Sequence, residues 1–245
     1  MNIFGLTDIG LVRRDNQDSY AIRVLSDDFA VAVVCDGMGG AQAGNVASAV
    51  AVEAFCAAVE NACKDGVPKD VQSRQEILTE ACRKANDRVF ELSLSAIEYQ
   101  GMGTTLVAAM IMHDEVHVVN VGDSRCYLAD ENTISQVTLD HSLVQVLVER
   151  GEITPEEARV HPKKNLITRA LGVDAQVMSD RYRVPREENS WLLLCSDGLS
   201  NVIPDEQLQS EIAQAEAPEE CARRLLAMTL EQGAPDNVTI VLAQL

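Results

Sequence analysis

Short apolar runs bordered by an aspartate recur along this sequence, and they constrain its fold more than any other feature. Three such runs lead into Asp36-Gly37, Gly122-Asp123 and Ser196-Asp197-Gly198, and in a fourth case Asp236 stands just before the run. Runs of this length that are rich in β-branched residues predict strands. A fold in which these strand ends meet would gather several carboxylates in one place.

Gathered carboxylates point to bound cations. An aspartate at the end of a buried strand is rigidly placed, and a glycine after it lets a ligand or backbone come close. Taken singly, each Asp-Gly pair is more often a turn. Four clustered carboxylates would repel one another unless a cation lay among them, and Mg²⁺ or Mn²⁺ prefers such all-oxygen sites. The pattern therefore predicts a two-metal hydrolytic site.

The remaining periodic segments predict an α+β fold. Strands are expected at 30–35, 106–112, 116–121, 191–195 and 238–243, and helices at 45–63, 74–97 and 218–231. Two long helices followed by a strand pair fit a layered α+β architecture better than a regular βαβ alternation. Residues 140–172 differ, with a short helix at 142–150, a helix start at Thr154-Pro155 and a loop at 161–165. They are predicted to be a subdomain inserted into a single domain.

The net charge narrows the range of partners. The 245 residues include 38 acidic and 20 basic side chains, which gives a formal charge of -18. Such a surface would repel a polyphosphate backbone or an anionic membrane, so nucleic acid is not an expected partner. The same field attracts divalent cations and basic peptide segments, although an acidic surface often serves solubility alone.

The cysteines and the first residues predict a cytoplasmic protein. The seven cysteines are scattered and include no Cys-x-x-Cys pair, so they are expected to be small buried hydrophobes in a reducing compartment. The segment from Met1 to Asp8 lacks the basic and apolar regions of a signal peptide. No apolar stretch elsewhere is expected to approach membrane-spanning length.

A second polar cluster lies in the segment from Gly10 to Asp18. An arginine there, such as Arg13, can bind phosphate oxygens in a bidentate manner, and Asp18 could order water on a metal ion. Without the aspartates described above, Arg13-Arg14-Asp15 would be interpreted as a solvated charge cluster. The two clusters together favour a site that acts on a phosphate group.

Short motifs stand in a fixed order along nearly the whole chain. They are Arg13-x-x-Asn16-Gln17-Asp18, Asp36-Gly37-Met38-Gly39-Gly40, Gly101-Met102-Gly103-Thr104-Thr105, Gly122-Asp123-Ser124-Arg125, Asp140-His141-Ser142, Ser196-Asp197-Gly198 and Asp236-Asn237. Each motif is weak alone, but the set resembles that of the PPM (PP2C-like) family of metal-dependent serine/threonine protein phosphatases, bacterial type. The resemblance implies a four-layer αββα sandwich of two antiparallel sheets flanked by helices, in which residues 140–172 form a flap.

The resemblance also implies the roles of the metal ligands. Asp36 would bridge two Mn²⁺ or Mg²⁺ ions, the Gly37 carbonyl would bind the second, and Asp197 and Asp236 would hold the first. A hydroxide between the ions would attack the phosphorus of phosphoserine or phosphothreonine. No protein nucleophile is then needed.

The N-terminal motif supplies two further implied roles, and the chain departs from the family's pattern at Met38 and Gln17. Arg13 would orient the phosphate, and Asp18 would fix water on the metal as an outer carboxylate. Met38 stands where animal-type members carry a histidine proposed as the leaving-group acid, so protonation of the leaving group would come from water on a metal. Gln17 replaces a glutamate found in many members, which implies that the second metal relies more on water.

Two assignments stay open at this point. By the resemblance Asp123 would hold a third metal together with Asp197, but an aspartate after a strand often only caps its turn. In the flap, the basic residues Lys163, Lys164 and Arg169 could contact a phosphoprotein, but a solvated face is the more common use of such residues.

The implied partners are a phosphoprotein and an opposing bacterial serine/threonine kinase, and the chain is expected to be a monomer. A metal-dependent nuclease would use the same carboxylates, but the acidic surface argues against it. A scaffold that has lost activity would lack Asp36, Asp197 or Asp236, and all three are present. A regulator that dephosphorylates a single partner would have the same active site and stays an alternative.

Overall fold

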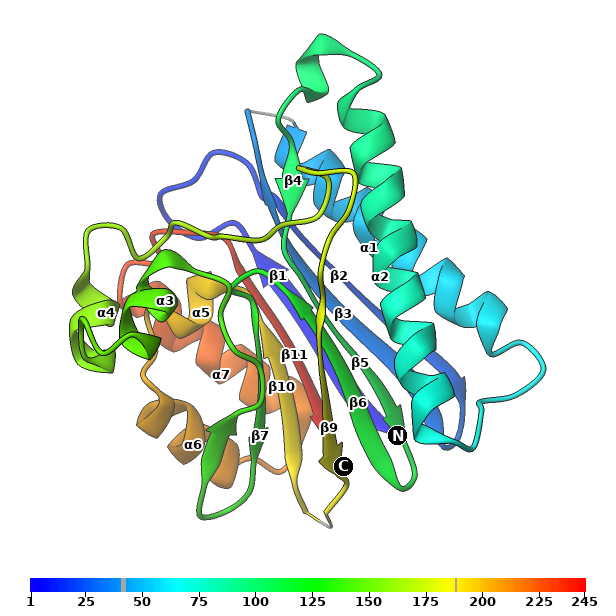
Figure 1. The fold of residues 1–245 in the computed structure, drawn as a ribbon. Helices are drawn as coiled ribbons and strands as arrows, with labels where there is room; N and C mark the ends of the chain where they lie inside the picture. The colour runs from blue at the N-terminus through cyan, green and yellow to red at the C-terminus, as the bar shows by residue number, and fades with distance from the viewer. Residues whose placement is uncertain (41–42, 188) are drawn as a thin grey trace.

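Two antiparallel sheets lie face to face, with helices on both outer sides (Figure 1). The computed structural model describes residues 1–40, 43–187 and 189–245. The first sheet has the order β1 (Asn2–Asp8), β11 (Val238–Gln244), β10 (Trp191–Cys195), β7 (Arg125–Ala129) and β8 (Ile134–Gln136). The second has the order β2 (Asp18–Ser26), β3 (Phe29–Met38), β5 (Leu106–Met112), β6 (Glu115–Val121) and β9 (Asp180–Pro185), and the short β4 (Gly103–Thr104) pairs with β3. The predicted αββα sandwich is confirmed.

The helices divide into two layers and an inserted pair. Over the second sheet lie α1 (Ala43–Ala62) and α2 (Val71–Ser93), with the 3-10 turn η1 (Ile97–Tyr99) after them. Over the first sheet lie α5 (Asp197–Ser200), α6 (Asp205–Ala213) and α7 (Pro218–Glu231). The flap contains α3 (Leu143–Glu149) and α4 (Pro155–Val160), and α4 begins with the capping box of Thr154 and Glu157.

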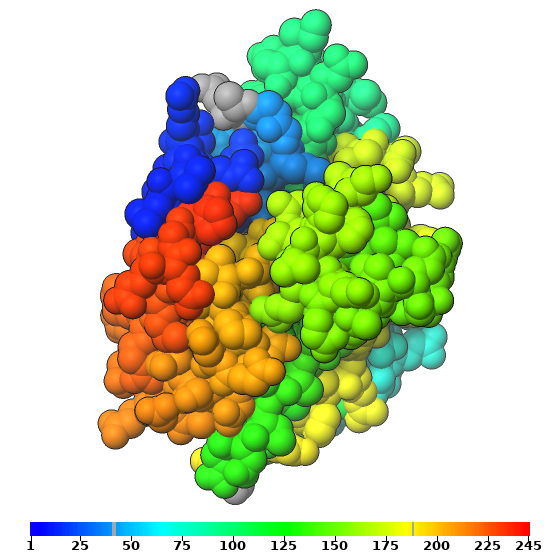
Figure 2. Space-filling view, turned by 90° about the vertical axis from the view of Figure 1, so that its left-hand side faces the viewer, coloured from blue at the N-terminus to red at the C-terminus, as the bar shows by residue number. Residues whose placement is uncertain are grey.

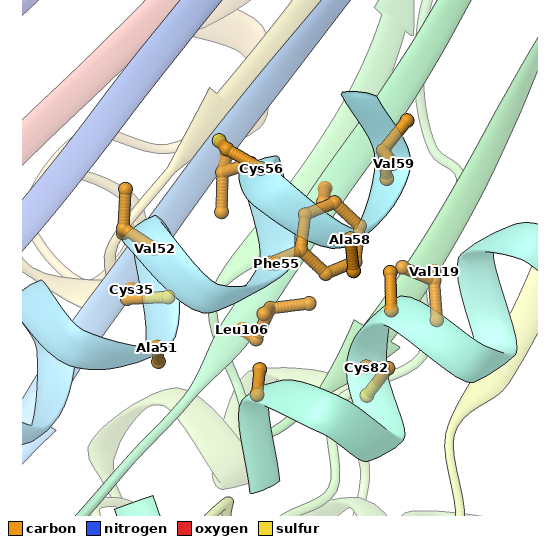
Figure 3. Packing of buried hydrophobic residues seen from close by; sticks show 14 of the residues in the cluster. Cys35, Ala51, Val52, Phe55, Cys56, Ala58, Val59, Cys82, Leu106 and Val119 are labelled. Carbon is orange, nitrogen blue, oxygen red and sulfur yellow. The ribbon is translucent and has the colours of Figure 1, made fainter. Parts of the chain in front are cut away.

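The layer of α1 and α2 is packed on the second sheet by small and medium-sized apolar side chains (Figure 3). Phe55 of α1 lies near Leu106 of β5 and is fully buried. Cys35, Cys56 and Cys82 belong to the same cluster, and all seven cysteines are free and buried. The prediction that they are buried hydrophobes is therefore confirmed.

Helix α1 reaches membrane-spanning length, contrary to the expectation from the sequence. It is 20 residues long and has a mean hydropathy of 1.3 in its most apolar window. Half of that window is buried in the protein, where Ala47, Ala51 and Phe55 pack into the core. Such a composition is typical of a core helix in a globular domain, because small residues allow close packing.

Helix α2 is shorter than predicted. The helical spacing of apolar residues continues to Ile97 in the sequence, but the helix ends at Ser93, and Leu94 is its C-cap. Beyond that point Leu94 is 73% exposed and Ile97 is 86% exposed. The periodicity was misleading here because no surface of the protein covers these side chains, and helices of this kind depend on burial of their apolar face.

A buried ionic cluster joins α2 to the sheet beneath it. Glu115, at the start of β6, accepts hydrogen bonds from Arg74 Nη1 at 2.5 Å and His117 Nε2 at 2.6 Å. Arg183 of β9 donates to its second carboxylate oxygen. Burial alone would raise the pKa of Glu115, but these hydrogen bonds outweigh it and lower the pKa to about 2. Glu115 therefore holds three elements together in its ionised form.

We expect Glu115→Gln to destabilise the protein at neutral pH and to flatten its response to acid. A lowered pKa adds stability above the usual value of 4.5, and that stability is lost as the pH falls toward about 2. At roughly 1.4 kcal/mol per pKa unit the contribution is about 3 kcal/mol. Thermal melts from pH 7 to pH 2.5 measure it, and Glu53→Gln, in an exposed pair with Arg23, is the control. Parallel curves for Glu115→Gln and the unmodified protein would contradict the assignment.

Candidate metal centre

The predicted carboxylates converge at one end of the sandwich. Asp36 lies within β3 and faces Asp18 across the β2–β3 ladder. Asp197 begins α5 directly after β10, and Asp236 precedes β11. Figure 2 shows the blue N-terminal loop, the red segment before β11 and the yellow-green flap around this end of the molecule. The two sheets therefore bring together carboxylates from distant parts of the sequence.

Asp36 occupies the centre of this group. Its backbone is fixed by the last residue of β4 and the residue after it, because Thr105 Oγ1 accepts the Asp36 N–H at 2.9 Å and Thr104 Oγ1 donates to the Asp36 carbonyl at 2.9 Å. Burial raises the pKa of the Asp36 carboxyl well above its usual value, and the charges of Asp18 and Asp197 raise it further. A cation at this position would favour the ionised form of the carboxyl group and oppose this rise in pKa.

Gly37 is required by the close approach of two other segments. A Cβ atom at this position would lie 2.0 Å from the Gly44 carbonyl oxygen of α1 and 2.6 Å from the Gln17 carbonyl oxygen. The Gly37 N–H donates to that Gln17 oxygen at 3.0 Å. No side chain fits there, so the peptide unit of Gly37 can stand next to Asp36 as a backbone ligand.

Asp18 is buried and only half satisfied. Its Oδ2 accepts hydrogen bonds from Ser196 Oγ and Thr239 Oγ1, both at 2.7 Å. Its Oδ1 is buried without a hydrogen-bond partner among the described residues. Burial raises the pKa of Asp18 to about 7, against the lowering effect of the two hydroxyl groups. A free oxygen of this kind is suited to hold a water that belongs to a metal ion.

Ser196 and Thr239 received no role from the sequence, although both hold Asp18 in place. Ser196 lies in the motif Ser196-Asp197-Gly198, but only Asp197 of that motif was predicted to have a role. Thr239 is a polar residue within the apolar strand β11, where every residue from Val238 to Ala243 is buried. A buried hydroxyl in a strand needs a partner, and that requirement is the signal that could have identified Thr239.

Asp197 and Asp236 lie on the other side of the group. Asp197 Oδ2 accepts from Asn201 Nδ2 at 2.9 Å, and its Oδ1 is buried without a partner among the described residues. Burial and the neighbouring charge of Asp236 raise the pKa of Asp197 to about 6. Asp236 Oδ1 accepts the N–H of Asn237 at 2.9 Å, so one carboxylate oxygen remains for another ligand.

Arg13 takes that remaining oxygen. Its Nη2 atom lies 2.6 Å from Asp236 Oδ2, and the Arg13 side chain is half exposed. The hydrogen bond to Asp236 is the main cause that raises the pKa of Arg13. The structure thus places Arg13 beside the carboxylate group, paired with one of the predicted metal ligands, and its predicted contact with a phosphate stays a prediction.

Asp123 shares a pocket with Asp197. The pocket has a volume of about 500 Å³, and its lining also includes Arg125, Asp140 and Lys164. Burial and the charge of Asp197 raise the pKa of Asp123 to about 8. Arg125 is bound by Asp140 at 2.7 Å, so its charge is already matched. The structure brings Asp123 to the group, as a third metal site requires.

The group as a whole fits hard divalent cations. Its donors are carboxylate oxygens, two of which are buried without partners among the described residues, and Mg²⁺ and Mn²⁺ prefer such ligands. In the part of the chain that the structure describes, no group of three or more His, Cys, Asp or Glu side chains is placed closely enough to hold a metal ion by side chains alone. Ions of this kind keep several waters and need few protein ligands, so an open arrangement is compatible with them.

The flap forms one wall of the pocket that contains Asp123. Lys164 lines this pocket, whereas Arg169 is bound to Asp180 at 2.8 Å and Lys163 is exposed. A second pocket of about 500 Å³ lies along the end of the flap, where Met38 meets Ile167, Val173 and Val177. Among the three basic residues that the sequence singled out, Lys164 is therefore the one that lines the pocket of Asp123.

Comparisons with known proteins agree on one family. The family model for protein phosphatase 2C matches residues 13–231. The serine/threonine phosphatase stp of Listeria welshimeri is 37% identical over 240 residues, which are 97% of this chain and 93% of that protein. The crystal structure of Stp1 from Staphylococcus aureus matches with a TM-score of 0.92 and 33% identity over 100% of this chain and 95% of that one. The catalytic domain of PstP, in complex with two manganese ions, gives a TM-score of 0.84 and 35% identity over 99% and 96%.

Proposed function

This chain belongs to the protein phosphatase 2C family and is a serine/threonine protein phosphatase, and we propose that its clustered aspartates hold the divalent cations used in the hydrolysis. The observation that carries the proposal is the convergence of carboxylates around Asp36, two of which have a buried oxygen without a partner among the described residues. In keeping with it, burial and the charges of Asp18, Asp197, Asp123 and Asp236 raise the pKa of Asp36. Such a group is unfavourable without cations and favourable with them.

The residues that would hold the two ions are Asp36, Asp197 and Asp236 with their carboxylates and Gly37 with its carbonyl group, as the resemblance to the family implied. The convergence of these residues at one end of the sandwich supports the assignment. The two manganese ions in the PstP structure support Mn²⁺ in this chain, and Mg²⁺ has the same preference for oxygen. When bound, the ions lower the pKa of the attacking water and neutralise the phosphoryl oxygens.

The protein's own groups orient the phosphate. A cation on Asp236 Oδ2 would compete with Arg13 for that oxygen and would leave the Arg13 guanidinium, which stands next to the site, available to the phosphate. A released guanidinium binds phosphate oxygens in a bidentate manner. Asp18, held by Ser196 and Thr239, fixes water with its free oxygen. Met38 has no proton to donate, so the leaving group takes its proton from water.

Arg13→Ala is expected to raise KM for a small aryl phosphate more than it lowers kcat. Arg13 would bind the phosphate in the ground state and in the transition state alike, and uniform binding of that kind acts on KM. Initial rates across substrate concentrations at saturating Mn²⁺ measure both constants. Arg14→Ala, at the exposed neighbouring position, is the control and should leave KM unchanged. A loss of kcat at constant KM would place Arg13 in the chemical step.

Metal dependence tests the proposed function directly. The protein is stripped with a chelator, and hydrolysis of a phosphothreonine peptide and of an aryl phosphate is followed as Mn²⁺, Mg²⁺ or Ca²⁺ is restored. Activity should vanish with the chelator and return with Mn²⁺, because clustered carboxylates alone cannot activate water. Full turnover in the presence of the chelator would refute the role of the metals.

The substrate, partners and location are further parts of the proposal. A phosphoprotein would approach the pocket between the flap and α5, where Lys164 stands near Asp197. We propose that the flap, residues 140–172, selects the substrate, that Asp123 holds a third ion, and that a monomer opposes a serine/threonine kinase in the cytoplasm. A nuclease is disfavoured by the family and the acidic surface, and a scaffold by the presence of Asp36, Asp197 and Asp236.

A further inference from the structure

His141 joins the flap to the turn that carries Asp123. It is 5% exposed and lies just before α3, where the two legs of the flap meet. The His141 N–H donates to the Gly122 carbonyl at 2.9 Å, and the Thr168 N–H donates to the His141 carbonyl at 2.8 Å. The first of these bonds ties one leg of the flap to the turn, and the second ties the other leg to the first.

The side chain of His141 also connects the flap to the Gly122 turn, and its hydrogen bond there determines the tautomer of the ring. The Gly122 N–H donates to His141 Nδ1 at 3.0 Å. Since a backbone amide can only donate, Nδ1 must be without a proton. The proton of the neutral ring is then on Nε2, which lies 3.2 Å from Asp180 Oδ2 and 3.1 Å from Arg169 Nη1. Since a guanidinium can only donate, a protonated Nε2 donates to Asp180 and not to Arg169. Asp180 also accepts a hydrogen bond from Arg169 Nη1 at 2.8 Å, so its carboxylate is shared between the histidine and the far leg of the flap.

The turn held by His141 has little freedom of its own. Gly122 has a φ of 109°, which residues with a side chain rarely adopt. A Cβ atom there would lie 2.5 Å from Thr105 Cγ2, so the turn packs tightly against Thr105, whose hydroxyl group accepts the Asp36 N–H. Thr105 packs on one side and His141 bonds from the other. Asp123 is the next residue, and its carboxylate position depends on this peptide unit.

We propose that His141 is a positioning residue which, as its Nε2–H tautomer, fixes the Gly122–Asp123 turn to both legs of the flap and so holds the Asp123 carboxylate in place for an ion. This inference rests on the proposed third-ion role of Asp123. Burial lowers the pKa of His141, although Asp180 acts in the opposite direction, which supports the neutral ring that the hydrogen bonds require.

One consequence is that ion binding and flap position are linked. If the anchored flap increases the affinity of Asp123 for an ion, the ion must stabilise the anchored flap by the same factor. A phosphoprotein that contacts the flap would then change the affinity for that ion. The hydrogen bonds of His141 reach the Gly122–Asp123 turn, whereas the backbone of Asp36 is held by hydroxyl groups of Thr104 and Thr105. We therefore expect the coupling to act mainly on the ion at Asp123.

The test compares variants that retain different hydrogen-bonding positions of the His141 side chain. His141→Asn can offer its Oδ1 atom where Nδ1 stands, and so can still accept from Gly122. His141→Gln can reach Asp180 but offers no acceptor to Gly122, and His141→Ala offers neither. Mn²⁺ binding to the full chain is measured by calorimetry. The weakest ion should bind about 10- to 100-fold more weakly in the Ala and Gln variants, the range typical for loss of an outer partner. The tighter ions should be unaffected, and the Asn variant should lie near the unmodified protein.

A spectroscopic measurement on the unmodified protein makes the proposal independent of how the variants fold. In ¹⁵N spectra of the metal-free chain at neutral pH, Nδ1 of His141 should be unprotonated and Nε2 protonated, and the Gly122 amide should exchange slowly with solvent. A proton on Nδ1, or a Mn²⁺ binding curve that His141→Ala leaves unchanged, would overturn the role of His141.

Asp123→Ala separates this inference from the function on which it rests. If Asp123→Ala loses the weakest ion and His141→Ala does not, the inference about His141 fails while the third-ion role stands. If Asp123→Ala binds as many ions as the unmodified protein, the third-ion role fails, and the role of His141 fails with it. Absence of phosphothreonine hydrolysis by the unmodified protein would instead refute the proposed function.

Discussion

Asp36→Asn is expected to reduce hydrolysis of a phosphothreonine peptide by at least roughly 10³-fold while the protein stays folded. The loss is large because Asp36 alone among the ligands would contact both ions, and removal of even one oriented group that stabilises the transition state costs about 10²- to 10³-fold. The fold should survive because the amide relieves repulsion at a carboxyl whose pKa burial and its neighbours raise. Initial rates at saturating Mn²⁺, with a circular dichroism spectrum of each protein, measure both effects.

Two comparisons sharpen this expectation. Asp197→Asn and Asp236→Asn should be nearly as damaging, because each removes a direct ligand. Asp27→Asn, in the exposed turn between β2 and β3, should have no effect. Normal kcat in the variant of Asp36, Asp197 or Asp236 would show that the ligand was wrongly assigned.

The activity of Asp18→Asn should lie between that of Asp36→Asn and that of Asp27→Asn. Its Oδ2 is engaged by Ser196 and Thr239, so only its other oxygen is available toward the ions. Removal of a group that acts through water on a metal typically lowers activity about 10- to 100-fold.

Asp18 also shows what the sequence could not reveal, since its two hydroxyl partners lie 178 and 221 positions away along the chain.

The central strands and the C-terminal helix could be predicted because burial fixed their composition. Leu106–Met112 and Trp191–Cys195 are buried at every position, and continuous apolar runs of that length leave few alternatives. The helix from Pro218 to Glu231 has a proline in its first turn and a clear apolar face. In each case local sequence and tertiary burial favour the same structure.

The edge strands β1 and β9 could not be predicted, because their pairing partners are distant in the sequence or because they alternate partly buried and exposed residues. β1 has no fully buried residue, and its register pairs Asn2 with Gln244, so its stability comes from the far end of the chain. β9 alternates partly buried and exposed residues at the edge of the second sheet. Strand propensity depends on such neighbours more than on local sequence, which is why both strands were missed.

The sequence could predict which carboxylates lie near one another, but not how their side chains are arranged. The aspartates were identified from their places beside strands, but their mutual distances and pKa shifts depend on how two sheets meet. Arg13 and Asp236 are 223 positions apart in the sequence, and no local sequence pattern predicts their pairing. His141 was part of a quoted motif, yet its function follows only from the orientation of its ring between Gly122 and Asp180.

In the metal-free protein, Asp123→Asn is expected to raise the melting temperature, and the gain should depend on pH. Burial raises the pKa of Asp123 from its usual 3.8 to about 8. A carboxyl with a raised pKa destabilises the folded state as the pH rises, so the penalty is absent below about pH 4 and complete above about pH 8. Asparagine never ionises and avoids it. Relief of a single pKa unit corresponds to about 1.4 kcal/mol, which is several degrees in a protein of this size.

Saturating Mn²⁺ should reverse that order, and the reversal distinguishes a metal ligand from a turn residue. An ion that binds only the folded protein stabilises it by mass action, so the unmodified chain gains a site that Asp123→Asn lacks. If Asp123 merely capped its turn, asparagine would replace it with little change, because both residues suit that position. The test is a set of thermal melts of the unmodified protein and of Asp123→Asn at pH 5, 7 and 9, each with chelator and with Mn²⁺. Equal melting temperatures under all of these conditions would assign Asp123 to the turn alone.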